Sequence, residues 1–151
     1  MGRNALREGR KPIIRAPEGP PEGFLEMKIV VVGGGEVGYN VANTLSEEEH
    51  DVTVVEEDEE RAEKVDNELD VITVRGSGAR PQVLEEAGIF PGCDVDILVA
   101  CTDRDEVNIL ACWIAKRAGV KRVISRARAL EFTDSPTWAK DLGIDVMNSP
   151  E

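Results

Sequence analysis

A glycine-rich turn is the part of this sequence best suited to hold a ligand. It follows directly on the apolar run from Lys28 to Val32 and consists of Gly33, Gly34, Gly35, Glu36, Val37 and Gly38. Gly33 permits a tight turn, Gly35 lets the backbone approach a pyrophosphate, and Gly38 lets the following helix pack close to the strand. The amino end of that helix then faces the phosphates. This pattern predicts the strand, turn and helix of a dinucleotide-binding unit.

An acidic residue stands where the next apolar run ends. Glu56 lies 23 residues after Gly33, so we expect its carboxylate to reach the ribose hydroxyls of an adenosine. A glycine motif alone is weak evidence for a nucleotide site. The strand, the helix and the acid together favour a nucleotide-binding Rossmann unit, and the alternative is a glycine-rich turn that binds nothing.

Ligands of open α/β sheets bind outside the carboxyl ends of the strands. The candidate binding residues after the first strand's glycine turn are therefore Glu56, Glu57, Gly76, Ser77, Thr102, Asp103 and Arg126. Thr102 and Asp103 open a helix, where they could meet the second half of a dinucleotide or only cap that helix. Arg126 ends a buried strand and could bind an anion or pair with a neighbouring acid.

Residues for catalysis are few. His50 is the only histidine, and it precedes the second predicted strand, which places it at the amino end of the sheet, away from the ligand. Tyr39 is the only tyrosine, so the Tyr-x-x-x-Lys pair of many reductases is absent. Cys101 lies near the site without a histidine beside it and is a poor candidate nucleophile. We therefore expect no enzyme activity; the alternative is the cofactor domain of an NAD-dependent oxidoreductase whose catalytic part is missing.

The chain from Met27 onward alternates short β-branched runs with helical stretches, as a doubly wound parallel sheet requires. Six strands are predicted, at residues 28–32, 52–55, 71–74, 95–100, 123–127 and 145–147. The helices between them are predicted at residues 36–48, 58–69, 81–87, 103–118 and 135–141. The expected fold is a Rossmann-like α/β fold, with a six-stranded parallel sheet covered by helices on both faces.

The first 26 residues differ from everything that follows. Basic residues stand there among prolines and glycines without periodicity, which is typical of a disordered tail. A start-site artefact and a basic arm that contacts a partner are the alternatives. Residues 27–151 are then expected to form one domain, since a chain of 151 residues that is 41% hydrophobic can bury a single core.

Charge and cysteine content exclude several classes of function. The 30 acidic and 18 basic residues give a net charge of −12, which argues against nucleic acid or an anionic membrane surface as a direct partner. The three cysteines lack CxxC spacing, so neither a disulfide framework nor a zinc site is predicted. The sequence has no apolar stretch of the roughly 20 residues needed to insert into a membrane. We expect a cytoplasmic location.

Several strings of this sequence resemble the amino-terminal nucleotide-binding domain of Trk potassium-uptake regulatory proteins, also called the TrkA-N, RCK or KTN domain. They are MKIVVVGGGEVG, DVTVVEED, VRGSGARPQVLEEAG, LVACTDRDEVNILAC, RVISRA and SPE. The resemblance implies a regulatory domain or subunit at the inner face of the membrane that controls a potassium transporter or channel. It also implies gating by NAD(H), or by ATP or ADP as in relatives, and a homodimer or higher homo-oligomer.

The resemblance also implies roles by position. Residues 33–37 would hold the pyrophosphate, Glu56 the adenosine ribose, Thr102 and Asp103 the nicotinamide half, and Arg126 a phosphate or a nearby group. Glu56 stands where the family more often has the shorter aspartate, which could shift the ribose contact. Family members usually continue into a crossover helix and a second small domain, so the resemblance implies a fragment or a stand-alone nucleotide domain.

Overall fold

The computed structural model describes residues 23–127 and 136–148. Its elements are β1 Lys28–Val32, α2 Glu36–Glu47, β2 Asp51–Glu56, α3 Glu59–Glu68, β3 Ile72–Arg75, α4 Pro81–Glu86, β4 Ile97–Ala100, α5 Asp105–Ala118, β5 Arg122–Ala127, α7 Pro136–Leu142 and β6 Asp145–Asn148. Every predicted strand and helix is present, and its ends lie within two residues of the predicted ones.

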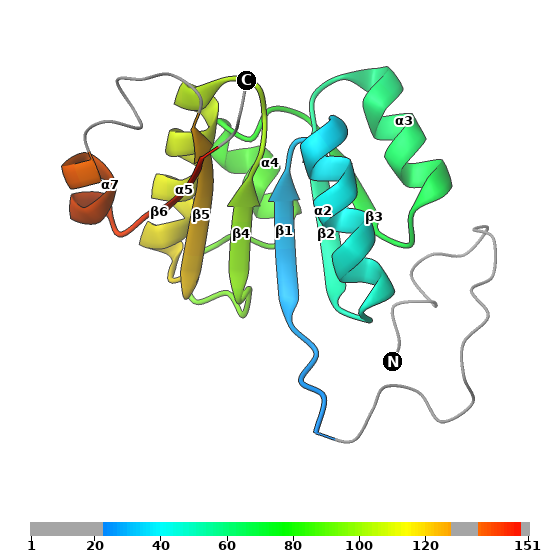
Figure 1. Cartoon of the computed structure of the whole chain (residues 1–151), viewed down its shortest axis with the longest axis horizontal. Coiled ribbons are helices and arrows are strands. Elements are labelled where there is room, and N and C mark those ends of the chain that lie inside the picture. Colours follow the sequence, from blue (N-terminus) through cyan, green and yellow to red (C-terminus); the bar gives the residue numbers. More distant parts are fainter. Residues whose placement is uncertain (1–22, 128–135, 149–151) are drawn as a thin grey trace.

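The sheet is parallel throughout and has the strand order β3-β2-β1-β4-β5-β6. The order reverses between β1 and β4, because the chain fills one side of β1 first and then crosses to the other side. In Figure 1 the strands run upward, so their carboxyl ends share the upper edge of the sheet. The predicted Rossmann-like fold is confirmed, and its switch point lies between β1 and β4.

Helices cover both faces of the sheet, as predicted (Figure 1). Alternate residues of β1 serve opposite faces: Ile29 and Val31 pack in the cluster beneath α2 and α3, whereas Val30 and Val32 pack in the cluster beneath α4 and α5. These four side chains are almost completely buried. Burial of each side chain stabilises the fold by about 1.5–3 kcal/mol. The buried strand β1 therefore fixes the position of the glycine turn that follows it.

The amino end of the sheet lies far from the predicted binding residues. His50 is buried there, and its Nδ1 accepts a hydrogen bond from the backbone N–H of Met27 at 3.1 Å. Its ring stacks on Phe24, with 5.2 Å between ring centroids. The predicted placement of His50 at this end is confirmed. Residues 1–22 of the predicted tail lie outside the described residues.

Candidate functional site

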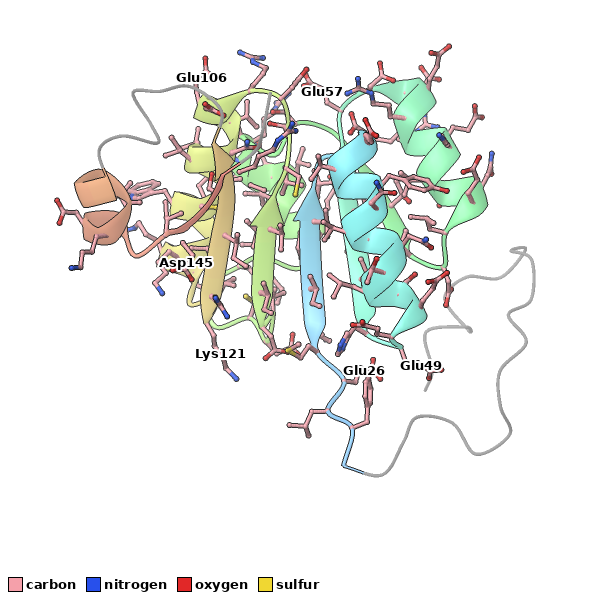
Figure 2. The ribbon with its side chains drawn as sticks, viewed as in Figure 1. Glu26, Glu49, Glu57, Glu106, Lys121 and Asp145 are labelled. Carbon is pink, nitrogen blue, oxygen red and sulfur yellow. The ribbon has the colours of Figure 1, made fainter. Side chains whose placement is uncertain are left out.

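A cavity of about 550 Å³ opens among the loops at the carboxyl ends of the strands. A volume in this range is typical of small-ligand sites. Ten of the thirteen predicted binding residues line it: Gly33, Gly35, Glu36, Val37, Glu56, Glu57, Gly76, Thr102, Asp103 and Arg126. Figure 2 shows Glu57 at this end of the molecule and Glu26 and Glu49 at the opposite end. The topology thus brings together residues at or just after the carboxyl ends of five strands, β1 to β5.

The glycine turn is held tightly against its neighbours. Gly33 has a φ of +109°, which favours glycine, and its N–H donates to the carbonyl oxygen of Val55 at 2.7 Å. A Cβ added to Gly38 would lie 1.9 Å from the carbonyl oxygen of Gly33. The missing side chain of Gly38 therefore lets α2 pack against the turn, and Gly38 stands behind the cavity wall.

Gly35 faces the cavity. It is the residue that precedes α2, with a φ of −74°, and no side chain caps the amino end of this helix. The nearest atom to a Cβ added there would be Nη1 of Arg61, at 3.6 Å. The open amino end of a helix is a favourable place for an anion, because its first backbone N–H groups and the helix dipole point toward it. The turn can therefore accept a phosphate group.

Glu56 is buried at the end of β2, with 6% of its surface exposed. Its Oε1 accepts a hydrogen bond from the N–H of Gly34 at 2.5 Å, and its Oε2 accepts one from the N–H of Asp58 at 2.7 Å. Gly34 thus positions the acid and does not itself line the cavity. Because a carboxylate has about four acceptor positions, Glu56 can still accept hydrogen bonds from a ligand.

Asn108 joins the loop after β4 to the end of β5. Its side chain is fully buried, and its Oδ1 accepts hydrogen bonds from the N–H of Thr102 at 2.9 Å and from the Thr102 hydroxyl at 2.6 Å. Its Nδ2 donates to the carbonyl oxygens of Thr102, at 3.0 Å, and Arg126, at 3.1 Å. The two predicted binding residues Thr102 and Arg126 are therefore held together by one satisfied carboxamide.

The predicted cap of α5 was wrong. Thr102 or Asp103 was expected to cap this helix, but Arg104 precedes its first residue, and no side chain caps it. The Thr102 hydroxyl is instead used within its own loop, where it bonds Asn108 and accepts from the N–H of Arg104 at 3.2 Å. Thr102 and Asp103 therefore lie on the cavity wall ahead of the helix.

Arg126 and Cys101 lie side by side on the cavity wall. Arg126 Nη1 donates to the carbonyl oxygen of Cys101 at 3.4 Å. Burial raises the pKa of the Cys101 thiol to about 11, against the smaller opposing effect of Arg126. The thiol is therefore protonated near neutral pH and is a poor nucleophile, as the sequence indicated.

Residues 29–150 match the family model of the TrkA-N domain. The chain belongs to the TrkA-N family. This confirms the resemblance found in the sequence.

TrkA-N relatives share much of the sequence. Trk system potassium uptake protein TrkA homolog 2 of Methanosarcina mazei is 45% identical over 133 residues, and TrkA of Halomonas elongata is 42% identical over 130 residues; each match covers 83% of this chain. This TrkA-N chain spans 28% and 27% of their respective lengths.

Solved structures share the TrkA-N fold. The TrkA-N domain of the inner membrane protein ybaL of Escherichia coli superposes with a TM-score of 0.67 at 19% identity, over 83% of this chain and 89% of that one. The GsuK channel bound to NAD superposes with a TM-score of 0.65 at 16% identity, over 84% of this chain and 22% of that one.

Some features of this TrkA-N site were not predicted from the sequence. Arg61 lines the cavity from α3, and Asn108 supports it from within α5. Two signals in the sequence could have found them: a basic side chain five residues after Glu56, and a polar residue on the apolar face of α5. Ser77, which was predicted to bind, does not line the cavity. Its hydroxyl oxygen instead accepts a hydrogen bond from the N–H of Ala79 at 3.1 Å, within its own turn.

Proposed function

We propose that this chain is the NAD(H)-binding part of a regulator of potassium uptake and that it acts without catalysis. The observation that carries this proposal is the cavity in which Gly35 opens toward the ligand space and Glu56 is held at the end of β2. The relatives named Trk system potassium uptake proteins support the biological role. The NAD-bound GsuK channel, which shares this fold, supports the class of ligand.

The charge of the cavity favours NAD(H) over ATP and ADP. Among the described residues that line it, six carboxylates face three guanidinium groups. A ligand with fewer negative charges suffers less repulsion in such a site, and NAD⁺ is less negative than ATP. Adenine nucleotides without the nicotinamide retain the contacts to adenosine and phosphate, so we expect ATP and ADP to bind as well. Because they carry more negative charge than NAD⁺, we expect their binding to be weaker than that of NAD(H).

The lining of the cavity supports a binding role and not an enzymatic one. The residues that the structure shows on its wall include no histidine, tyrosine or lysine, which are the usual proton donors and acceptors of hydride-transfer sites. Bound NADH is therefore proposed to act as a signal. The regulator would work in the cytoplasm, held at the inner face of the membrane by a transporter or channel subunit. No helix in the described ranges is long and apolar enough to span a bilayer.

We expect NAD(H) to bind at least about tenfold more tightly than NADP(H). A 2′-phosphate on the adenosine ribose would approach the buried Glu56 carboxylate, and repulsion between like charges at a buried interface costs several kcal/mol. Calorimetric titration of both cofactors measures the preference. The variant Glu56→Gln keeps an acceptor oxygen but removes the charge, so it should reduce the difference. Equal or tighter binding of NADPH by the unmodified protein would contradict the ribose role of Glu56.

A regulator of this kind needs a surface for pairing, and we propose that this chain forms homodimers or larger homo-oligomers. Apolar side chains around Ile109, Trp113 and Trp138 were the candidates in the sequence. Ile109 packs against the core, and the side chain of Trp138 lies outside the described residues. Trp113 is 42% exposed, and Leu110 on the same helix is 40% exposed. These two side chains on α5 support pairing through this helix.

Regulation requires that the nucleotide bind two arrangements of the protein unequally. Thr102 and Arg126 are placed to respond to it, since both line the cavity and share the Asn108 side chain. Potassium uptake by cells that carry the full-length protein tests this. We expect Glu56→Ala and Arg126→Ala to weaken nucleotide binding and to abolish the response of transport to nucleotide.

The control for this experiment is Arg122→Ala. Arg122 lies on the same strand as Arg126 but at its opposite end, where it pairs with Asp145 at 3.1 Å. The Arg122→Ala variant should bind nucleotide like the parent, and its potassium uptake should respond to nucleotide as in the parent. If the two site variants bind nucleotide poorly while transport responds normally, nucleotide binding does not regulate transport.

A further inference from the structure

Arg61 is a cation on the cavity wall that faces the glycine turn. It lies in the first turn of α3, where its backbone N–H donates to Oδ2 of Asp58 at 2.9 Å. Its guanidinium reaches across to the start of α2. Nη1 lies 3.6 Å, and Cζ 3.8 Å, from the position that a Cβ on Gly35 would occupy. The positive charge therefore lies directly over the glycine whose missing side chain opens onto the cavity.

The charge of Arg61 has no partner within the described ranges. Its guanidinium forms neither an ion pair nor a hydrogen bond there, although acids flank it in the chain. Glu59, two residues earlier, pairs instead with Arg75 at 3.6 Å. The planar guanidinium therefore keeps its N–H donors available, and their fork geometry fits a phosphate group.

The acidic lining of the cavity means that a cation close to an anionic ligand favours its binding. Carboxylates outnumber guanidinium groups by six to three on its wall. Of the three arginines, Arg104 follows β4 and Arg126 belongs to β5, on the side where the second half of a dinucleotide is expected. Arg61 alone among them comes from the side of Glu56. A pyrophosphate bound over the glycine turn is repelled by the acids unless a positive charge lies close to it.

We infer that Arg61 is a phosphate-binding residue of this site. Its guanidinium and the amino end of α2 hold the pyrophosphate between them at Gly35. This inference rests on the proposed nucleotide-binding function. The Glu56 carboxylate is bonded to the N–H groups of Gly34 and Asp58, whereas the guanidinium lies at Gly35. Arg61 therefore contributes to the binding of every nucleotide with a diphosphate, and not selectively to those with a 2′-phosphate.

Calorimetric titration with NAD⁺, ADP and adenosine tests the inference, using the whole chain and its Arg61→Gln variant. We expect the variant to bind NAD⁺ and ADP about 10- to 100-fold more weakly, in line with the loss of a charge-assisted hydrogen bond. Adenosine has no phosphate, so its affinity should change by less than about twofold. The variant Arg61→Lys restores a point charge without the fork and should bind with intermediate affinity.

A matched control separates a direct contact from a change in overall charge. Lys64 lies one turn further along α3, and its Nζ lies 5.0 Å from the ring centroid of Tyr39 and does not line the cavity. Lys64→Gln should change each affinity by less than about twofold. The phosphate role of Arg61 is overturned if Arg61→Gln binds NAD⁺ and ADP like the parent, or if its affinity for adenosine falls as much as its affinity for NAD⁺ and ADP. If the folded parent binds no nucleotide at all, the proposed function fails together with this inference.

Discussion

We expect Gly35→Val to weaken the proposed binding of NAD⁺ by at least about 100-fold, while the chain stays folded. The valine side chain would fill the space that the pyrophosphate needs and would push against Arg61, whose Nη1 lies 3.6 Å from the added Cβ. The backbone at Gly35 has φ −74° and ψ −165°, an extended conformation that valine adopts without strain. We therefore expect the substitution at this position to lower the affinity for NAD⁺ without lowering the stability of the fold.

Calorimetric titration measures the loss of binding, and thermal unfolding measures the stability. We expect the midpoint to change by no more than about 4 °C, which corresponds to about 1 kcal/mol for a domain of this size. Thr44→Val is the control, since Thr44 is exposed on α2 and does not line the cavity. Normal NAD⁺ binding by Gly35→Val, or failure of the variant to fold, would show that Gly35 does not have the assigned role.

Gly38→Ala should have the opposite effect and destabilise the fold by more than about 3 kcal/mol. An alanine in place of glycine ordinarily stabilises a helix interior by about 1 kcal/mol. Here the added Cβ would lie 1.9 Å from the carbonyl oxygen of Gly33 and 2.7 Å from its carbonyl carbon. These are backbone atoms, so relief requires α2 to move away from β1 and to lose buried contacts on that face.

Denaturation with urea, followed by circular dichroism, measures this loss. Ala42→Gly, one turn further along α2 at a fully buried position, shows the effect of changing a small buried residue without the clash. If the Gly38→Ala variant is as stable as the parent, α2 does not pack on the glycine turn as described.

The elements could be predicted because their signals are local. The strands are short runs of β-branched and aliphatic residues, and the strand β1 reads KIVVV because both of its faces are buried. Gly119 stops α5 in the left-handed conformation, with a φ of +101°, as a glycine after a helix indicates. The glycine turn and Glu56 were predictable for the same reason, since they belong to one continuous strand, helix and strand.

The rest of the site depends on contacts between distant segments. Asn108 is important because it bonds both Thr102 and Arg126, and Arg126 is 18 residues away in the chain. Arg61 is important because its guanidinium reaches Gly35 on another helix. Neither contact leaves a spacing pattern in the sequence. The misplaced cap of α5 has a different, local origin. A threonine before a helix is a usual cap, but here the buried Asn108, six residues further along, accepts the hydrogen bond of the Thr102 hydroxyl.

The reversal of strand order between β1 and β4 has a consequence for how long the protein survives in the cell. One half of the sheet, β1 to β3, and the other half, β4 to β6, both contribute to the cavity wall. A nucleotide that filled this cavity would contact both halves and would dissociate when either half opened. At a concentration 100 times its Kd, such a ligand adds about 2.7 kcal/mol to stability. Proteases cleave transiently opened chains, so degradation of this domain would slow when the cofactor is abundant and quicken when it is scarce.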